Sequence, residues 1–297
     1  MPTAPDAFTT LPAIARHQAA KTSQYRHVTG ILPRKLPIAL DYALAHHALE
    51  GAERAARAED TSLLNWYLAN PDAGLRGLSR TGTAALAHAT PEDMTRSEIS
   101  ETPYYVLGPH TSRVDHLVQH VTEARAHAAA TGFVSLLERH APIVCLMHHK
   151  DPAQTLLSWS ITRLPGTVFT DYTHSPRITG RDLVHEAGHN WLNDALAATH
   201  TRVDEGQFFS PWRNETRPAF GFLHACWAFP LTMLYASRLL KQGKVTAHEE
   251  QFFTAYLGQQ RGLLAQTEKS HPEALRLVED EGLANVLAGV YERARSV

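Results

Sequence analysis

The sequence predicts a predominantly helical α+β fold in which a small antiparallel or mixed sheet directly precedes one central helix. Before residue 140 and after residue 179, apolar residues recur mostly at the spacing of α-helices. The segment between these two parts instead holds short apolar, β-branched and aromatic runs that are separated by turn-forming residues. Strand signals confined to one part of a helical chain are typical of an α+β domain.

The N-terminal half is predicted to be helical. Residues 36–58 carry apolar side chains at helical spacing, and Thr61–Ala69 repeats this pattern. Residues 111–140 predict two helices that meet near Gly132. Residues 91–109 are polar and contain prolines, so they are predicted to form a long loop or a linker.

Three short runs in the middle of the chain predict strands. Residues 142–147 are continuously apolar, whereas residues 155–162 and Thr167–Tyr172 are rich in β-branched and aromatic side chains. The last two runs flank Leu164-Pro165-Gly166, and a Pro-Gly pair between two such runs suggests a hairpin. The predicted sheet therefore ends shortly before His185.

The C-terminal part is predicted to be helical again. Three residue pairs resemble capping boxes, in which a hydroxyl and an acidic side chain three residues later bond the N–H groups of a helix start. These pairs are Thr179 with Asp182, Thr246 with Glu249, and Ser270 with Glu273. Pro218 fits the start of a further helix that runs to about Leu240. Its apolar part, residues 225–240, is shorter than a membrane span and predicts a buried core helix.

The composition argues against nucleic acid or an anionic membrane as the main partner. Lys plus Arg number 28 and Asp plus Glu number 30, so the formal net charge is −2. The only cysteines are Cys145 and Cys226, fewer than a secreted domain normally uses. Residues 1–10 lack the pattern of a signal peptide. A cytoplasmic protein with two free thiols is therefore expected.

The central helix carries the motif His185-Glu186-Ala187-Gly188-His189. Imidazoles four residues apart lie on one face of a helix, one turn apart, so both can bind the same cation. A chain with 19 histidines can match this short motif by chance. The strands just upstream and the apolar continuation of the same helix face favour a metal site. Gly188 costs about 1 kcal/mol of helix stability relative to Ala, which suggests close approach by a neighbouring element.

Two histidines do not complete a metal site, so the third ligand determines the chemistry. A third histidine within six residues of the motif is absent. Glu205 and Glu215 are available carboxylates, but they lie in a loop-like stretch. His224 is the stronger candidate because it lies in the apolar helix that Pro218 opens, where an imidazole needs a partner. The alternative for His224 is a buried histidine bonded to a carbonyl group.

The residues before His224 suggest an anionic ligand. Arg213 and Arg217 precede the helix. Guanidinium groups pair bidentately with carboxylates, so these arginines could bind an anionic group. The alternative is that both are solvated loop residues. A neutral three-histidine site suits zinc with a water, or iron with a chelating co-substrate and dioxygen. Candidates to line the substrate pocket, with plain core packing as the alternative, are Trp191, Trp212 and Phe220.

Three segments together resemble a known family. They are residues 183–189 with the motif, Pro211-Trp212-Arg213, and residues 217–225 (Arg-Pro-Ala-Phe-Gly-Phe-Leu-His-Ala). They are similar to HExxH-motif proteins associated with ribosomally synthesised peptide natural products. The similarity runs from residue 142 to residue 229, under a third of the chain. It implies an Fe(II)- and 2-oxoglutarate-dependent β-hydroxylase of peptide side chains, with a zincin-like active-site helix.

The resemblance also implies a role for each matching residue. His185, His189 and His224 would bind iron, and Glu186 would be a partner of these ligands rather than a base that activates water. Arg217 or Arg213 would pair with the distal carboxylate of 2-oxoglutarate, with Arg217 preferred because it directly precedes the ligand helix. The implied partner is a peptide substrate, namely a ribosomally made precursor.

Two other functions stay open on the sequence alone. A zinc peptidase would use Glu186 to deprotonate a zinc-bound water. A non-catalytic peptide-binding protein would hold the metal for structural reasons only. In each case residues 1–110 are expected to form an N-terminal helical region and residues 111–297 a metal-binding region, unless the two form one continuous domain.

Overall fold

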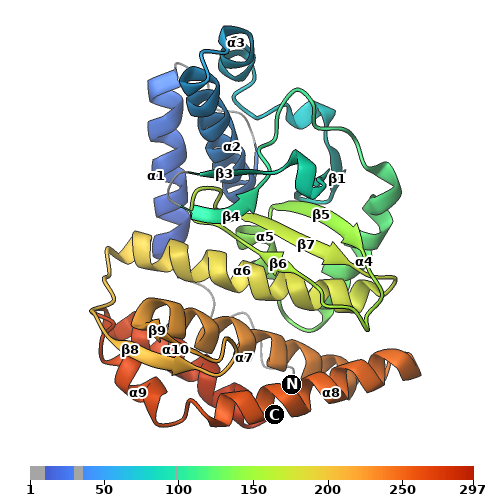
Figure 1. Cartoon of the computed structure of the whole chain (residues 1–297), viewed down its shortest axis with the longest axis vertical. Coiled ribbons are helices and arrows are strands. Elements are labelled where there is room, and N and C mark those ends of the chain that lie inside the picture. Colours follow the sequence, from blue (N-terminus) through green and yellow to red (C-terminus); the bar gives the residue numbers. More distant parts are fainter. Residues whose placement is uncertain (1–10, 30–35, 98–99) are drawn as a thin grey trace.

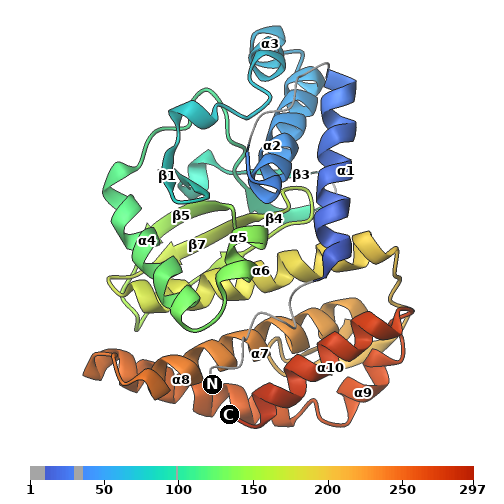
Figure 2. The same cartoon turned by 180° about the vertical axis from the view of Figure 1, so that it is seen from behind.

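Helix α6 (Pro176–Thr199) runs through the middle of the protein and separates two groups of elements (Figure 1). The computed structural model describes residues 11–29, 36–97 and 100–297. On one side of α6 lie the N-terminal helices and a sheet, and on the other side lie the C-terminal helices; Figure 2 shows the same division from behind. The fold is therefore mixed α+β and mostly helical, as predicted.

The helices predicted for residues 36–58, 61–69, 111–140 and 218–240 are present with similar ends, whereas no separate helices were predicted at residues 12–29 and 281–295. The helices before α6 are α1 (Pro12–Thr29), α2 (Ile38–Arg57), α3 (Thr61–Ala69), α4 (Asp115–Ala130) and α5 (Val134–His140). Those after α6 are α7 (Ala219–Gln242), α8 (Ala247–Ala265), α9 (Ser270–Leu275) and α10 (Glu281–Arg295). Two 3-10 turns are η2 (Leu75–Gly77) and η3 (Pro91–Asp93). The predicted break between α4 and α5 falls at Gly132, whose φ of 88° favours glycine.

The main sheet is mixed and has the strand order β1-β2-β5-β7-β6. Its strands are β1 (Ser79–Thr81), β2 (Ala84–His88), β5 (Ile143–His149), β6 (Ser158–Trp159) and β7 (Thr167–Tyr172). Strands β2, β5 and β7 are parallel, while β1 and β6 run antiparallel at the two edges. The predicted hairpin between β6 and β7 is confirmed, and Gly166 in its connection has a φ of 76°.

Three predictions of helix or loop were wrong because the chain forms strands there. Strands β1 and β2 lie in the half that was predicted to be helical, and β2 is rich in alanine, which gives little strand signal. Within residues 91–109, β3 (Thr95–Ser97) and β4 (Ser100–Tyr104) form a hairpin. The loop-like stretch before α7 forms another hairpin, from β8 (Gln207–Ser210) and β9 (Glu215–Pro218).

The start of α6 differs from the predicted one. Ser175 caps the helix, because its side chain accepts a hydrogen bond from the Ile178 N–H. Thr179 and Asp182 therefore lie inside the helix, and Asp182 pairs with Arg181 instead of forming a capping box. The helix gains one turn at its N-terminus, which brings it directly up to β7.

Of the other two predicted capping boxes, one is present. Thr246 and Glu249 form both reciprocal hydrogen bonds at the start of α8, so this prediction is confirmed. Ser270 and Glu273 do not, because α9 begins at Ser270 itself and has no side-chain cap. Pro218 is the N-cap residue of α7, within one residue of the predicted helix start.

Helix α6 is buried between the sheet and α7. It packs against β7, α4 and α5 on one side and against α7 on the other. A second apolar cluster fills the space between α2 and the opposite face of the sheet, around Leu40, Leu44 and Phe169. The main sheet takes β1 and β2 from residues 1–110 and its other strands from residues 111–297. The division at residue 110 itself stays a prediction.

Helix α7 behaves as the expected core helix. It is the one helix in the described part of the chain whose length and hydropathy would allow a membrane span. However, 72 % of its apolar window is buried inside the protein. The first ten residues, for which no signal peptide is expected, lie outside the described residues.

Helices α6 and α7 approach each other closely at Gly188, as its sequence position suggested. The indole Nε1 of Trp227 donates a 2.8 Å hydrogen bond to the Gly188 carbonyl. A Cβ atom on residue 188 would lie 2.8 Å from Leu231 Cδ1 and 3.6 Å from Ala228 Cα. The missing side chain therefore lets α7 pack directly on the backbone of the motif.

This contact predicts that Gly188→Val destabilises the protein. The added methyl groups would force the two helices apart or distort Leu231, and overpacking of this kind costs about 1–3 kcal/mol. Denaturant unfolding measures the loss. The matched control is Gly258→Val in α8, where a new Cβ would meet nothing within 4 Å. Equal unfolding midpoints for the two variants would contradict the close packing.

Candidate metal centre

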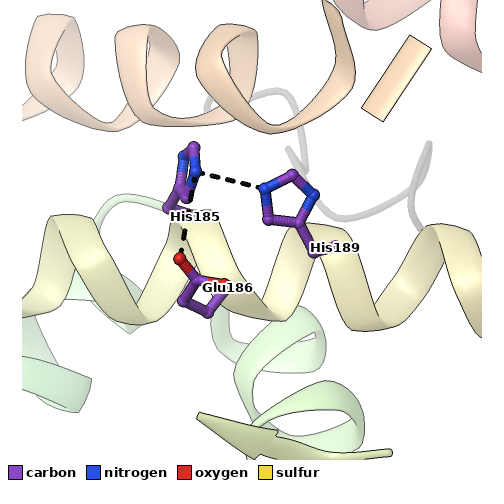
Figure 3. Close-up of side chains that lie close together, drawn as sticks. All are labelled: His185, Glu186 and His189. Atoms are coloured by element: carbon purple, nitrogen blue, oxygen red, sulfur yellow. Dashed lines mark hydrogen bonds and ion pairs between the residues drawn. The ribbon is translucent and has the colours of Figure 1, made fainter. Parts of the chain in front are cut away.

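The two histidines of the motif lie side by side on α6. Figure 3 shows the rings of His185 and His189 on the side of α6 that faces α7. Their Nε2 atoms are 3.2 Å apart. Two nitrogens that each lie roughly 2.0–2.1 Å from one cation can have this separation. The pair therefore fits a shared metal ion.

Glu186 adds a buried carboxyl group beside this pair. Its Oε1 atom lies 3.9 Å from Nε2 of His185 and accepts a 2.7 Å hydrogen bond from the Ser158 hydroxyl on β6. Burial raises the pKa of Glu186 to about 8. Its Oε2 atom is buried without a hydrogen-bond partner among the described residues. The ligand atoms of His185, Glu186 and His189 all lie within 4.8 Å of one another, so they could hold a cation together.

The structure places the ring of His224 next to His189. Its Nδ1 atom lies 3.1 Å from Nδ1 of His189, and the two rings stack with centroids 5.3 Å apart. His189 thus presents Nε2 to His185 and Nδ1 to His224. Binding of one cation by all three rings requires a side-chain rotation at His224 or His189. Nε2 of His224 is buried and has no partner in the described part of the chain, which suits a metal ligand.

The three imidazoles are neutral at pH 7. Burial lowers the pKa of His189 to about 4 and lowers the pKa values of His185 and His224 well below their ordinary range. The positive charge of Arg213 also lowers the pKa values of His185 and His189. That of Arg217 lowers the pKa of His224. A metal ion needs imidazole ligands in this deprotonated form.

These side chains line a pocket of about 670 Å³. The rest of its wall comes mainly from residues 158–162, which begin at edge strand β6, from the β8–β9 hairpin and from the first half of α7. Of the residues predicted to bind co-substrate or substrate, four line this pocket: Arg213, Arg217, Trp212 and Phe220.

Trp191 does not line this pocket, and the structure shows the alternative for this residue, which is plain core packing. Its side chain is fully buried and stacks on Trp227 with ring centroids 4.4 Å apart. Position 191 lies two residues after His189, which is about 200° around a helix with 3.6 residues per turn. Trp191 therefore faces the core rather than the metal ligands.

Aromatic rings form the apolar wall of the pocket. The Trp212 ring stacks on Phe229 at 4.8 Å, and its Nε1 donates to Gln260. Phe229 in turn lies 4.7 Å from the His185 ring, measured between centroids. Phe220 lies 4.2 Å from the His224 ring by the same measure and is 44 % exposed. These rings thus cover part of His185 and His224 with apolar surface.

The sequence did not reveal all the residues of the site. The hydrogen bond from Ser158 to Glu186 joins positions 28 residues apart, which no local pattern connects. Phe229 lay in the predicted helix, but only the tertiary structure places it against His185. The buried hydroxyl of Ser210 also lines the pocket, and its strand was predicted as loop.

The two arginines make the pocket electrostatically positive. Glu186 is the one acidic residue among the described residues that line it, and its raised pKa keeps it largely protonated at pH 7. Arg217 lies 3.8 Å from the exposed carboxylate of Glu215, whereas Arg213 has no carboxylate within ion-pair distance among the described residues. Neutral metal ligands beside two guanidinium groups, one of which has only a long contact with an exposed carboxylate, suit a cation and an anionic ligand bound together.

No family model and no curated protein matches this chain. The interpretation of the pocket therefore rests on the chemistry of its side chains. That chemistry consists of three neutral imidazoles, a buried carboxyl group and two arginines around one cavity.

We expect the purified protein to bind about one equivalent of Zn(II) or Fe(II) at this site. His185→Gln and His189→Gln should each weaken binding by at least about tenfold, because each removes a ligand nitrogen. Competition with a chromogenic chelator measures the affinity. The control is His248→Gln, which changes an exposed histidine on α8. Unchanged affinity in both motif variants would show that the metal binds elsewhere.

Proposed function

We propose that this protein is an Fe(II)- and 2-oxoglutarate-dependent hydroxylase of peptide side chains that acts in ribosomal peptide natural-product biosynthesis. One observation carries the proposal: histidines from α6 and α7 share a pocket with two arginines from the β8–β9 hairpin. A metal ion and an anionic co-substrate could therefore bind in the same cavity. The resemblance of residues 142–229 to HExxH-motif hydroxylases, carried by residues 183–189, 211–213 and 217–225, supports the same function.

The donor set fits iron. His185, His189 and His224 would hold the cation, and the buried, unpartnered Nε2 of His224 supports its inclusion. Bound Fe(II), together with 2-oxoglutarate and dioxygen, supplies the oxidant that hydroxylates an unactivated C–H bond. Arg217 or Arg213 would bind the distal carboxylate of the co-substrate. The stacked rings of Trp212 and Phe229 would keep water away from the reacting groups.

Two features support a zincin-like arrangement and a peptide substrate. The motif helix lies against a mixed sheet whose antiparallel edge strand, β6, lines the pocket. An extended peptide can add to an exposed sheet edge through main-chain hydrogen bonds. Ser158 on this strand also holds Glu186, so the strand and the motif are directly linked.

A zinc peptidase is the second candidate, because Glu186 lies close to a metal-ligand nitrogen. Its Oε1 atom is 3.9 Å from Nε2 of His185, near the place where a metal-bound water would be. A carboxyl group whose pKa is raised to about 8 by burial is suited to accept and return a proton near neutral pH. We prefer the hydroxylase because its co-substrate supplies a carboxylate that the two arginines can bind.

Two parallel incubations test the proposal. The first contains anaerobically purified protein, Fe(II), ascorbate, 2-oxoglutarate and a library of candidate precursor peptides, and is then exposed to air. The second contains Zn(II) in place of iron and omits 2-oxoglutarate. A hydroxylase gives succinate and a gain of one oxygen in a peptide of the first mixture. Peptide cleavage in the second mixture, without succinate in the first, would contradict it.

Glu186→Gln separates the two candidates further. A peptidase that loses its general base should lose about 10²- to 10⁴-fold in rate. A hydroxylase should keep measurable succinate formation, because there Glu186 is not a base and only accepts a hydrogen bond from Ser158 beside the metal ligands. The glutamine amide preserves the size of the side chain and can still accept from Ser158. The measurements are the rates of succinate formation in the iron mixture and of peptide cleavage in the zinc mixture, for the wild type and for the variant.

A further inference from the structure

We propose that Ser210, Arg217 and the first turn of α7 form a binding subsite for a carboxylate, and that Gly221 positions the Arg217 guanidinium in it. This inference deepens the proposed function and rests on it for the identity of the pocket. It adds two residues, Ser210 and Gly221, to the chemistry of the site. The preference for Arg217 over Arg213, stated above from the resemblance, gains support from the strand register.

Ser210 provides a hydroxyl group that lacks a partner. Its side chain is fully buried at the end of β8, and its Oγ atom has no hydrogen-bond partner among the described residues. Ser210 nevertheless lines the pocket. Buried polar groups are almost always hydrogen-bonded in folded proteins, so an unpartnered hydroxyl at a pocket wall indicates a missing ligand oxygen.

The strand register places Arg217 on the same face of the hairpin. Ser210 pairs with Glu215 and Phe208 pairs with Arg217, so Ser210 and Arg217 are diagonal neighbours on one face. Both line the pocket. The contact between Arg217 and Glu215, at 3.8 Å, is long, and the Glu215 side chain is 59 % exposed. This exposed carboxylate can be replaced by a ligand without breaking a short ion pair.

Gly221 allows the guanidinium to lie against the first turn of α7. A Cβ atom on residue 221 would be 3.2 Å from Nε of Arg217 and 3.4 Å from its Nη2. The helix start also carries partial positive charge. Its cap residue, Pro218, offers no side-chain acceptor to the N–H groups there. Arg217 and the helix terminus therefore attract an anion to the same place.

The donors match a carboxylate. One edge of a guanidinium and one hydroxyl group can satisfy the two oxygens of a planar carboxylate. This group can come from two sources: the distal end of a small 2-oxo dicarboxylic acid, or an acidic side chain of the peptide substrate. Both would present the same chemistry to Ser210 and Arg217.

Calorimetric titration of the Zn(II)-loaded protein, which cannot turn over, tests the subsite. The first pair of probes is 2-oxoglutarate and 2-oxopentanoate, which lacks the second carboxylate. The second pair is the α-amides of N-acetylglutamate and N-acetylglutamine. We expect the carboxylate member of one pair to bind at least about tenfold more tightly. The pair that shows this preference identifies the source. No preference in either pair would overturn the proposal.

The variants are Ser210→Ala and Gly221→Ala. Each should reduce the preference for the carboxylate probe to less than about threefold. Neither should lower the melting temperature, because the Ser210 hydroxyl has no partner to lose and alanine favours a helix over glycine. Gly258→Ala in α8, where a new Cβ meets nothing within 4 Å, is the control and should bind like the wild type. If both variants kept the wild-type preference for the carboxylate probe, the roles assigned to Ser210 and Gly221 would be overturned.

The result is independent of turnover. A carboxylate preference that both variants lose, without any succinate formation by the wild type, would support the subsite and contradict the hydroxylase. Succinate formation by the wild type, with full preference in both variants, would support the hydroxylase and overturn the subsite.

Discussion

The contact between α6 and α7 at Gly188 is the constraint on which the site depends. A side chain at this position would meet Leu231, so only glycine lets α7 lie directly on the backbone of the motif. The indole of Trp227 then bonds the Gly188 carbonyl and fixes the two helices relative to each other. This packing brings the ring of His224 to its place beside His189. The metal centre is therefore a product of helix packing, and not of the motif alone.

Burial favours the neutral forms of the histidines and of the carboxyl group in the pocket. It keeps the imidazoles of α6 and α7 neutral, and it raises the pKa of Glu186 to about 8. The β8–β9 hairpin adds the two guanidinium groups of Arg213 and Arg217 to the same pocket. The cavity thus offers nitrogen ligands to a cation and positive charge to an anion, which is the combination that the proposed reaction needs.

Local sequence signals predicted the elements with strong periodicity or clear turns. Helices such as Thr61–Ala69, the β6–β7 hairpin around Gly166 and the helix opened at Pro218 follow from such signals. Strand β2 was missed because its alanines are stabilised by pairing with β1 and β5, which no local pattern encodes. The β8–β9 hairpin was missed because Pro211 and Asn214, which suggested a loop, form its turn. Trp191 faces the core because it lies about 200° around α6 from His189.

X-ray absorption spectroscopy of the anaerobic Fe(II)-loaded protein tests the central claim most directly, because it counts the imidazoles bound to the metal. The account predicts that the spectrum of the wild type fits with one more imidazole than that of His224→Gln. This difference would show that His224 turns from its contact with His189 and joins the two histidines of α6 on one cation. Equal imidazole counts in the two proteins would contradict the three-histidine centre.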